Sequence, residues 1–306
     1  MLEVAPDESG RRLDVFLAER LGLSRAQTRR LLAHGMVQVG GRSVGETAKG
    51  VAVRGGETVV IEPFTSPGEQ RVRAEPDLPL RIAAEGPGWF AADKPAGVPV
   101  HPLRVDETGT LANAVIARHP DMHGVGEGAL RSGVVHRLDV DTSGVLLFAT
   151  REARWQELRA AFRAHRVDKR YRAIALGRLD EDGHVELPLL TARHRPARVR
   201  VASEAERRAA RGVRAARLQW RVLERFADAT LLEVAPVTGF LHQIRAILAH
   251  LGHPLAGDRS YASREDPTGA ARHMLHASHV AVDDVSASAP DAPDFAALLE
   301  RLRAAP

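Results

Sequence analysis

The sequence contains no cysteine and very little lysine in its 306 residues. Without cysteine the chain has no disulfide, no thiolate metal site and no cysteine nucleophile, which suits a reducing compartment. No segment approaches the roughly 20 apolar residues that a membrane helix needs. The N-terminal stretch MLEVAPDESGRRLDVFL has acidic residues where a secretory signal would be basic. We therefore expect a cytoplasmic protein that does not enter a membrane.

The scarcity of lysine makes the basic part of the composition almost entirely arginine. Lysine occurs only at Lys49, Lys94 and Lys169, which leaves 40 arginines among the 43 basic residues, and the sequence pI is about 10.0. The planar guanidinium group suits phosphate oxygens and stacks on bases, so this composition favours a nucleic-acid partner. A bias towards GC-rich codons is the alternative, and the many alanines, glycines and prolines support it. Composition alone leaves both explanations open.

Residues 1–62 have the pattern of a small unit. Apolar residues recur at helical spacing at Leu13, Phe16, Leu17 and Leu21. A second helix is predicted from the N-cap Ser24 to a stop at Gly35, and the segments MVQV and ETVVIE that follow are typical of short strands joined by turns. Arg25 and Arg29 lie four residues apart on one face of the second helix, either for RNA phosphates or as a solvated face.

This unit resembles the S4 RNA-binding domain. The resemblance is carried by RLDVFL, LSRAQTRRLLAHGMVQVGG and GGETVVIE, between residues 12 and 62. The sequence departs from the usual pattern at Gly40 and Glu57, both in predicted turns. The resemblance implies that residues 1–62 bind RNA, with Arg25 and Arg29 among the contacts.

The rest of the chain is predicted to be a linker and one larger domain. Residues 63–79 contain four prolines that interrupt regular structure, so we expect a linker there. In residues 80–306, strands such as GVLLFAT, KRYRAIAL and ATLLEVAP mix with helices without regular βαβ spacing, which favours the α+β class. One helix is predicted to bury a stripe formed by Leu241, Ile244, Leu248 and Leu251.

The segment VVHRLDVDTSGVLLFAT, residues 134–150, holds two candidate catalytic carboxylates. Asp141 begins a sequence close to the Asp-Thr/Ser-Gly of aspartic proteases, where two aspartates share one proton, but the chain has no second copy. A metal hydrolase of the H-E-x-x-H type is disfavoured because that motif is absent. What remains is Asp139 as a lone catalytic carboxylate beside Arg137, or a solvated turn without chemistry.

Five stretches decide between these interpretations because they occur in the order of the RluA-type pseudouridine synthases. They are ADKPAGVPVHP, GVVHRLDVDTSGVLLFAT, VDKRYRAIALG, TGFLHQIRAILAHLGHPLAGDRSY and HMLHA. The resemblance implies that residues 80–306 form a pseudouridine-synthase domain with a mixed, largely antiparallel sheet flanked by helices and loops. Enzymes of this family break the bond from ribose to N1 of a uridine in RNA, turn the uracil and rejoin it through C5. They use no cofactor and no metal.

The resemblance also implies roles for individual residues. Asp139 matches the nucleophile, Arg245 the arginine that pairs with it, and Tyr171 the tyrosine that packs on the target base. Substrate contacts are expected from Arg137, which matches a residue that fills the space of the flipped-out nucleotide, and from His136 and Lys169. The expected partner is structured RNA, ribosomal RNA before transfer RNA, bound by a monomer. The sequence leaves open whether Asp139 attacks the ribose or the base.

The match to this family breaks in one neighbourhood. The family usually has TGRTHQIRVH where this chain has TGFLHQIRAIL, and the apolar replacements are Phe240, Leu241 and Ile247, with Leu218 in place of another threonine. These changes leave the three catalytic candidates in place. They keep open the alternative of an RNA-binding or RNA-folding protein of the same fold with weakened or lost activity.

A second basic feature lies between residues 193 and 217, a stretch that contains nine arginines and only two acidic residues, Glu204 and Glu206. A mobile loop that contacts RNA phosphates is the functional interpretation. A solvated run of charge is the alternative, and the sequence does not choose between them.

Overall fold

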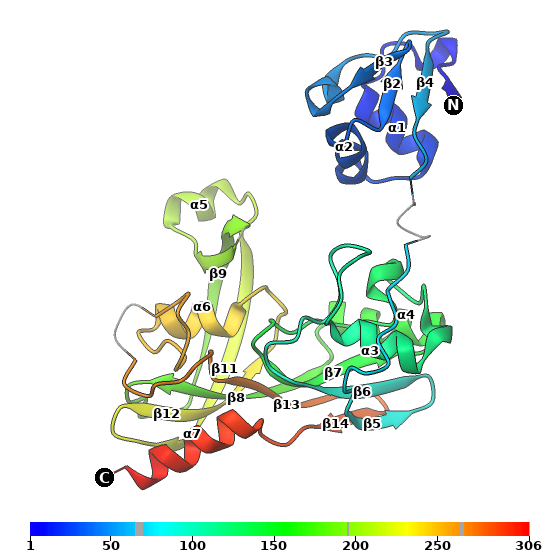
Figure 1. Ribbon diagram of the computed structural model, residues 1–306. Coiled ribbons are helices and arrows are strands. Elements are labelled where there is room, and N and C mark those ends of the chain that lie inside the picture. The colour runs from blue at the N-terminus through cyan, green and yellow to red at the C-terminus, as the bar shows by residue number, and fades with distance from the viewer. Residues whose placement is uncertain (65–69, 195, 263–265, 306) are drawn as a thin grey trace. The chain divides into compact units, whose positions relative to one another are not determined.

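The computed structural model describes residues 1–64, 70–194, 196–262 and 266–305 (Figure 1). The chain divides into two compact units, Met1–Ser66 and Pro67–Pro306. We describe each unit by itself.

The first unit packs two helices on a small antiparallel sheet. The sheet has the strand order β1-β4-β2-β3, and the elements are β1 (Leu2–Glu3), α1 (Leu13–Leu21), α2 (Arg25–Ala33), β2 (Val37–Val39), β3 (Arg42–Val44) and β4 (Thr58–Ile61). Helix α2 begins as the sequence predicts, because Ser24 and Gln27 exchange hydrogen bonds in a capping box. The side chains of Phe16 and Leu17 are fully buried against both the second helix and the sheet.

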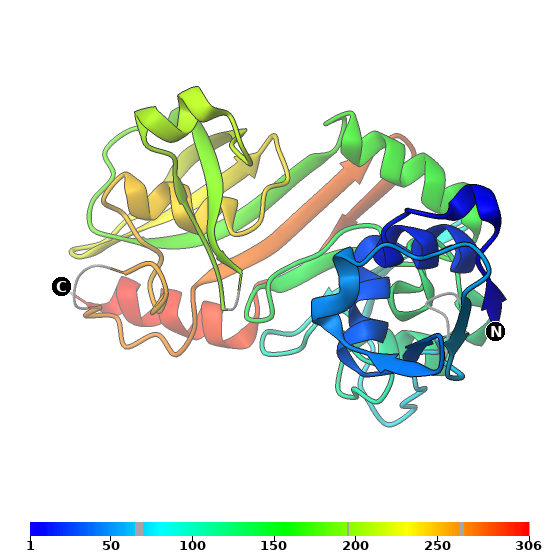
Figure 2. The same ribbon diagram turned by 90° about the horizontal axis from the view of Figure 1, so that it is seen from above.

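The second unit is built on one ten-stranded sheet of order β10-β9-β11-β12-β8-β13-β7-β6-β5, with β14 paired to β13. Only β13 and β7 pair in parallel among the described strands, so the prediction of a mixed, largely antiparallel α+β fold is confirmed. Figure 2 shows β13, in orange, running through the middle of the sheet. The strands are β5 (Ile82–Gly86), β6 (Trp89–Lys94), β7 (Ser143–Ala149), β8 (Asp168–Leu176), β9 (Gly183–His194), β10 (Ala197–Val201), β11 (Arg214–Arg225), β12 (Ala229–Pro236), β13 (Leu275–Val282) and β14 (Val285–Ser288).

Helices cover both faces of this sheet. The α-helices of this unit are α3 (Leu111–Arg118), α4 (Glu152–Arg163), α5 (Glu204–Ala209), α6 (Gln243–His250) and α7 (Pro293–Ala304), of which α5 buries no residue. Residues of β8 alternate between two cores: Ala173 packs with α6, whereas Ile174 packs with α7. Successive strand residues point to opposite faces, so α6 and α7 lie on opposite sides of the sheet (Figure 1). This sandwich fixes α6, whose N-terminus carries part of the candidate site.

Part of the expected linker packs on the second unit. Val72 is buried in the core beneath α3. The side-chain amide of Asn113 donates to the carbonyl oxygen of Arg73, and the Glu75 amide donates to the Asn113 carbonyl oxygen. The buried Val72 side chain and these hydrogen bonds to Asn113 therefore hold the stretch around residues 72–75 against α3.

The structure adds to or corrects the expectations about local structure in three places. The sequence left a mobile loop and a solvated run of charge open for the basic stretch 193–217, and its described residues include β10, the short helix α5 and the start of β11. The predicted apolar stripe is shorter than expected, because Leu241 and Leu251 lie outside α6 and are each 37% exposed. Helix α7 was not anticipated, although Pro293 at its first turn and the spacing of Phe295, Leu298 and Leu299 are helical signals. Among the described residues, no helix is both long and apolar enough to cross a membrane.

Candidate active site

Asp139 lies in a loop that leads into β7, and the backbone of this loop is held at successive carbonyl groups. The carbonyl of Asp139 accepts from the Thr142 amide, and that of Val140 accepts from Lys94 Nζ at 2.7 Å. The Asp141 carbonyl accepts from Arg272 Nη1 at 2.8 Å. The loop therefore has little freedom, and the position of the Asp139 side chain is set by its neighbours.

Lys94 is the central anchor of this loop. Its side chain is fully buried, and Nζ also donates to the carbonyls of Pro95 and Val98 at 2.8 Å. Burial lowers the pKa of Lys94 to about 7, against the opposing attraction of Asp141. One buried ammonium group thus ties the DKPAG turn to the loop that carries Asp139.

The residues Thr142, Ser143 and Gly144, which follow Asp139, lie where β7 comes close to β13. Gly144 has φ +109°, and a Cβ there would lie 2.2 Å from the Ala277 carbonyl oxygen of β13. The hydroxyl groups before it point inward: Thr142 Oγ1 contacts His273 Nε2 at 2.9 Å, and Ser143 Oγ contacts His276 Nδ1 at 3.0 Å. The Thr-Ser-Gly sequence therefore docks the loop on β13, and this explains its likeness to the protease tripeptide without any protease chemistry.

The two carboxylates of the loop have different surroundings. Asp139 is 21% exposed and accepts a hydrogen bond from Arg245 Nη1 at 2.9 Å on Oδ2. Asp141 is exposed, and it contributes to the loop through its backbone carbonyl. The structure therefore gives a directed cation partner to Asp139 and a turn position to Asp141.

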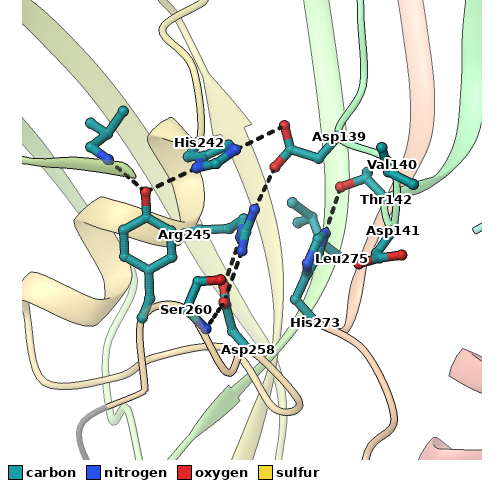
Figure 3. A network of polar contacts seen from close by, with 12 residues as sticks. Asp139, Val140, Asp141, Thr142, His242, Arg245, Asp258, Ser260, His273 and Leu275 are labelled. Carbon is teal, nitrogen blue, oxygen red and sulfur yellow. Dashed lines mark hydrogen bonds and ion pairs between the residues drawn. The ribbon is translucent and has the colours of Figure 1, made fainter. Parts of the chain in front are cut away.

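Arg245 is shared between two carboxylates. Its Nε and Nη2 donate to Asp258 at 2.7 and 2.9 Å, a bidentate pair, while Nη1 donates to Asp139 (Figure 3). Burial tends to lower the pKa of Arg245, but the hydrogen bonds and charges of Asp258 and Asp139 outweigh it and raise that pKa. The guanidinium is therefore a fixed cation with a single N–H directed at the candidate nucleophile.

Tyr171 comes from β8, on the face of the sheet covered by α6. Its ring packs against the core that contains Ala173, Val234 and Ile244. Burial, followed by the negative charge of Asp139, raises the pKa of the phenol. Tyr171 is thus near enough to Asp139 to sense its charge, and it stays protonated at neutral pH.

The other predicted substrate residues of the second unit have different environments. His136 Nε2 accepts from the Leu147 amide at 3.1 Å and its ring stacks on Phe162, so its polar edge is used inside the fold. Lys169 Nζ donates to the Thr238 carbonyl at 3.0 Å, just before α6. Arg137 is exposed and has no ion-pair partner within the described ranges. Of these three residues, Arg137 is the one whose charged group is free to meet a ligand.

Arg25 and Arg29 lie on α2 in the first unit, both exposed. Arg29 is 3.8 Å from the carboxylate of Asp14, which is itself fully buried. Arg12 binds the same carboxylate with two hydrogen bonds. A buried acid therefore helps to orient the basic face of α2.

The apolar replacements around α6 mostly repack the core. Ile247 and Leu218 are fully buried in one cluster, and Phe240 packs against it with partial exposure. Leu241 is the exception, since it is 37% exposed at the start of the helix. The pairing of Arg245 with Asp139 is present despite these changes.

The sequence did not identify three residues of the polar network around Arg245 and Asp139. Asp258 and Tyr261 come from the GDRSY turn, and His242 precedes α6 with its Nε2 3.8 Å from Asp139 Oδ1. The signal available was the glycine before Asp258: Gly257 has φ +77°, and a Cβ there would overlap the Arg272 carbonyl. Among the described residues, no cluster of three or more histidines and acidic side chains could hold a metal ion.

Comparison with known proteins identifies the family. The family model described as RNA pseudouridylate synthase matches residues 88–250, which is more than half of the chain. The chain belongs to the RNA pseudouridylate synthase family. It is therefore an enzyme of the pseudouridine synthase class, and the model of the S4 domain matches residues 11–55 of the same synthase.

Individual relatives agree with this assignment. An uncharacterized RNA pseudouridine synthase of Chloroflexus aurantiacus is 38% identical over 287 residues, 90% of this synthase and 83% of that protein. The ribosomal large subunit pseudouridine synthase D of Nitrosomonas europaea is 35% identical over 320 residues, which cover 100% of this chain and 88% of that protein. The structure of human RNA pseudouridylate synthase domain containing 4 superposes with a TM-score of 0.57 at 23% identity, over 73% of this chain and 93% of that one, which supports the fold.

Proposed function

We propose that this synthase converts uridine to pseudouridine in ribosomal RNA and that Asp139 is its nucleophile. The observation that carries the proposal is the half-buried carboxylate held by one N–H of a guanidinium that Asp258 fixes from behind. A carboxylate attacks only while it is ionised, and a cation beside it favours that form. Relatives named ribosomal large subunit pseudouridine synthase D support ribosomal RNA as the substrate.

The reaction is an isomerisation, so its atoms balance without a second substrate. The bond from ribose C1′ to uracil N1 breaks, the base turns, C5 bonds to C1′, and the C5 hydrogen leaves as a proton while N1 gains one. Asp139 assists by bonding to the sugar or to the base and by leaving again. Exposed Arg137, two residues before Asp139 in the chain, takes the space or the phosphate of a nucleotide turned out of its stack.

Tyr171 acts mainly by packing on the target base. An aromatic face is a common support for an unstacked base. Burial and the charge of Asp139 raise the phenol pKa, so the hydroxyl is protonated when the base arrives, and removal of the C5 proton by this oxygen is a secondary role. In the first unit, Arg25 and Arg29 supply phosphate contacts that raise affinity without reading the target uridine.

The test compares two carboxylates in the same loop. Asp139→Asn keeps the shape but removes the nucleophile, so pseudouridine formation in ribosomal RNA should vanish while RNA affinity stays within a few-fold. Asp141→Asn is the matched control and should keep most of the activity, since Asp141 acts through its backbone carbonyl. Because pseudouridine and uridine have the same mass, pseudouridine is first derivatised with a carbodiimide and then mapped by mass spectrometry in ribosomal and transfer RNA from cells with and without the gene.

Equal loss in both variants would indicate a two-carboxylate mechanism and contradict the role given to Asp139. If no uridine changes in the deletion strain and the purified protein modifies no bulk RNA, the alternative of an RNA-binding protein without activity is correct. Transfer RNA as a substrate, a monomeric state and a cytoplasmic location stay predictions.

A further inference from the structure

The two oxygens of Asp139 face different neighbours. Oδ2 accepts from Arg245, whereas Oδ1 receives no hydrogen bond within the described part of the chain. Oδ1 lies 3.8 Å from Nε2 of His242, a side chain that is 13% exposed (Figure 3). This distance is too long for a direct hydrogen bond, and catalytic hydrogen bonds often shorten only when substrate is bound.

The hydrogen bonds behind His242 define which ring nitrogen carries the proton. The Val199 amide donates to the hydroxyl oxygen of Tyr261 at 2.9 Å, and that oxygen lies 3.0 Å from His242 Nδ1. Since the oxygen already accepts from Val199, the arrangement in which its own hydrogen is donated to Nδ1 gives every polar group in the network a partner. We assign the neutral ring a hydrogen on Nε2 from this network. That N–H points towards Asp139.

Burial lowers the pKa of His242. The negative charge of Asp139 opposes this shift, and the positive charge of Arg245 adds to it. The ring is therefore neutral at neutral pH, in agreement with the assigned tautomer. A neutral N–H donor can orient the carboxylate of Asp139. A second cation would also orient it, but its charge would attract the carboxylate electrons more strongly and make Asp139 a weaker nucleophile.

The backbone of His242 is strained in a way that fixes the ring. His242 has φ 51° and ψ 21°, in the left-handed region, and it is the N-cap of α6. Its carbonyl accepts from the Ala246 amide, and its ring meets Tyr261 edge-on with centroids 5.8 Å apart. Glycine or asparagine adopts this conformation more easily, and strained residues of this kind cluster at functional sites.

We propose that His242 is a positioning residue that donates its Nε2–H to Oδ1 of Asp139 when RNA is bound. With Arg245 on one oxygen and His242 on the other, the plane of the carboxylate is fixed from two sides. Tyr261 selects the tautomer and also supports Arg245, whose guanidinium lies 5.0 Å from the centre of its ring. The proposal rests on the proposed function of Asp139.

Three substitutions at position 242 separate the donor from the backbone. His242→Phe keeps a ring without a donor, and kcat should fall at least tenfold while KM changes less than threefold. His242→Gln places an amide N–H near the position of Nε2 and should recover most of the rate. His242→Asn relieves the left-handed strain, but its shorter amide does not reach Oδ1, so its kcat should be as low as that of the Phe variant with an equal or higher Tm.

Tyr261→Phe is the second test, because it keeps the ring under Arg245 and removes only the hydroxyl group. Its kcat should lie between those of wild type and His242→Phe. Wild-type kcat in His242→Phe, or an equally poor folded His242→Gln, would overturn the proposal. If His242→Phe does not fold, the Gln and Asn variants still give the comparison.

A measurement without turnover distinguishes this proposal from failure of the proposed function. Imidazole ¹⁵N NMR of the full chain, with the His242 signals assigned by their loss in His242→Gln, should show the hydrogen on Nε2 in wild type and a change of tautomer population in Tyr261→Phe. A hydrogen on Nδ1 in wild type would refute the proposal whether or not the protein modifies RNA. An inactive wild type with the expected tautomer would instead refute the proposed function.

Discussion

Asp258 offers the sharpest test of how the site is held together, because it touches Asp139 only through Arg245. The Asp258 side chain is 1% exposed and that of Arg245 8%. Asp258→Asn keeps the size of the side chain but presents an amide NH₂ where one guanidinium N–H now donates. Breaking a buried ion pair costs about 3–5 kcal/mol, and the lower end applies because Asp139 still balances the guanidinium charge.

The expected loss of stability is measurable by thermal unfolding. A loss of about 3 kcal/mol corresponds to a fall in Tm of roughly 6–12 °C for a unit of this size. The matched control is Glu224→Gln, which breaks the bidentate pair with Arg303 at the surface, where the two side chains are 35% and 44% exposed. Solvent screens such a pair, so the control should leave Tm nearly unchanged.

Activity should fall together with stability, for a separate reason. Without Asp258, the guanidinium fork is free to turn and bind both oxygens of Asp139, including the oxygen that faces His242. We expect kcat to drop on the order of 10- to 100-fold, the cost of a misplaced catalytic group. KM should change little because Asp258 is buried and presents almost no surface for a ligand to contact. An Asp258→Asn protein with wild-type kcat and Tm would show that Arg245 needs no second carboxylate.

Three further predictions concern acid stability, RNA affinity and the apolar replacements. Burial lowers the pKa of three histidines from 6.5: that of His101 to about 4, that of His136 to about 3 and that of His273 to about 4. Between pH 6.5 and about pH 4 the unfolded chain binds protons at these histidines and the folded chain does not. The free energy of unfolding should therefore fall by up to about 1.4 kcal/mol per pH unit for each histidine as the pH is lowered. An unchanged Tm between pH 7 and pH 5 would argue against this. Replacing Arg25 and Arg29 together by Gln should reduce the slope of log K for RNA against log salt by about 1.4–1.8, the value for two phosphate contacts, and an unchanged slope would place the RNA elsewhere. Phe240→Arg should lower stability by about 1 kcal/mol without raising kcat, because Phe240 packs on the core; a faster and equally stable variant would mean that the apolar change had weakened the site.

The sequence by itself determined the elements and the chemical groups. The capping box at Ser24 and the strand GVLLFAT after Asp139 follow from local rules of hydrogen bonding and periodicity, and both are present in the fold. The RluA-type motifs singled out Asp139 and Arg245, which lie far apart in the chain and meet at 2.9 Å. Motif order carries such information because it reflects a shared fold.

Only the tertiary structure decided how Arg245 divides its hydrogen bonds, because that depends on a turn brought in from beyond α6. Asp258 and Tyr261 reach the site through packing that no local pattern encodes, and His242 takes a left-handed conformation that helical periodicity cannot anticipate. The same limit applies to Leu241, which the apolar spacing placed in the core and the helix start leaves exposed. Sequence periodicity reports which residues share a face, whereas burial and donor direction depend on what the rest of the chain places against that face.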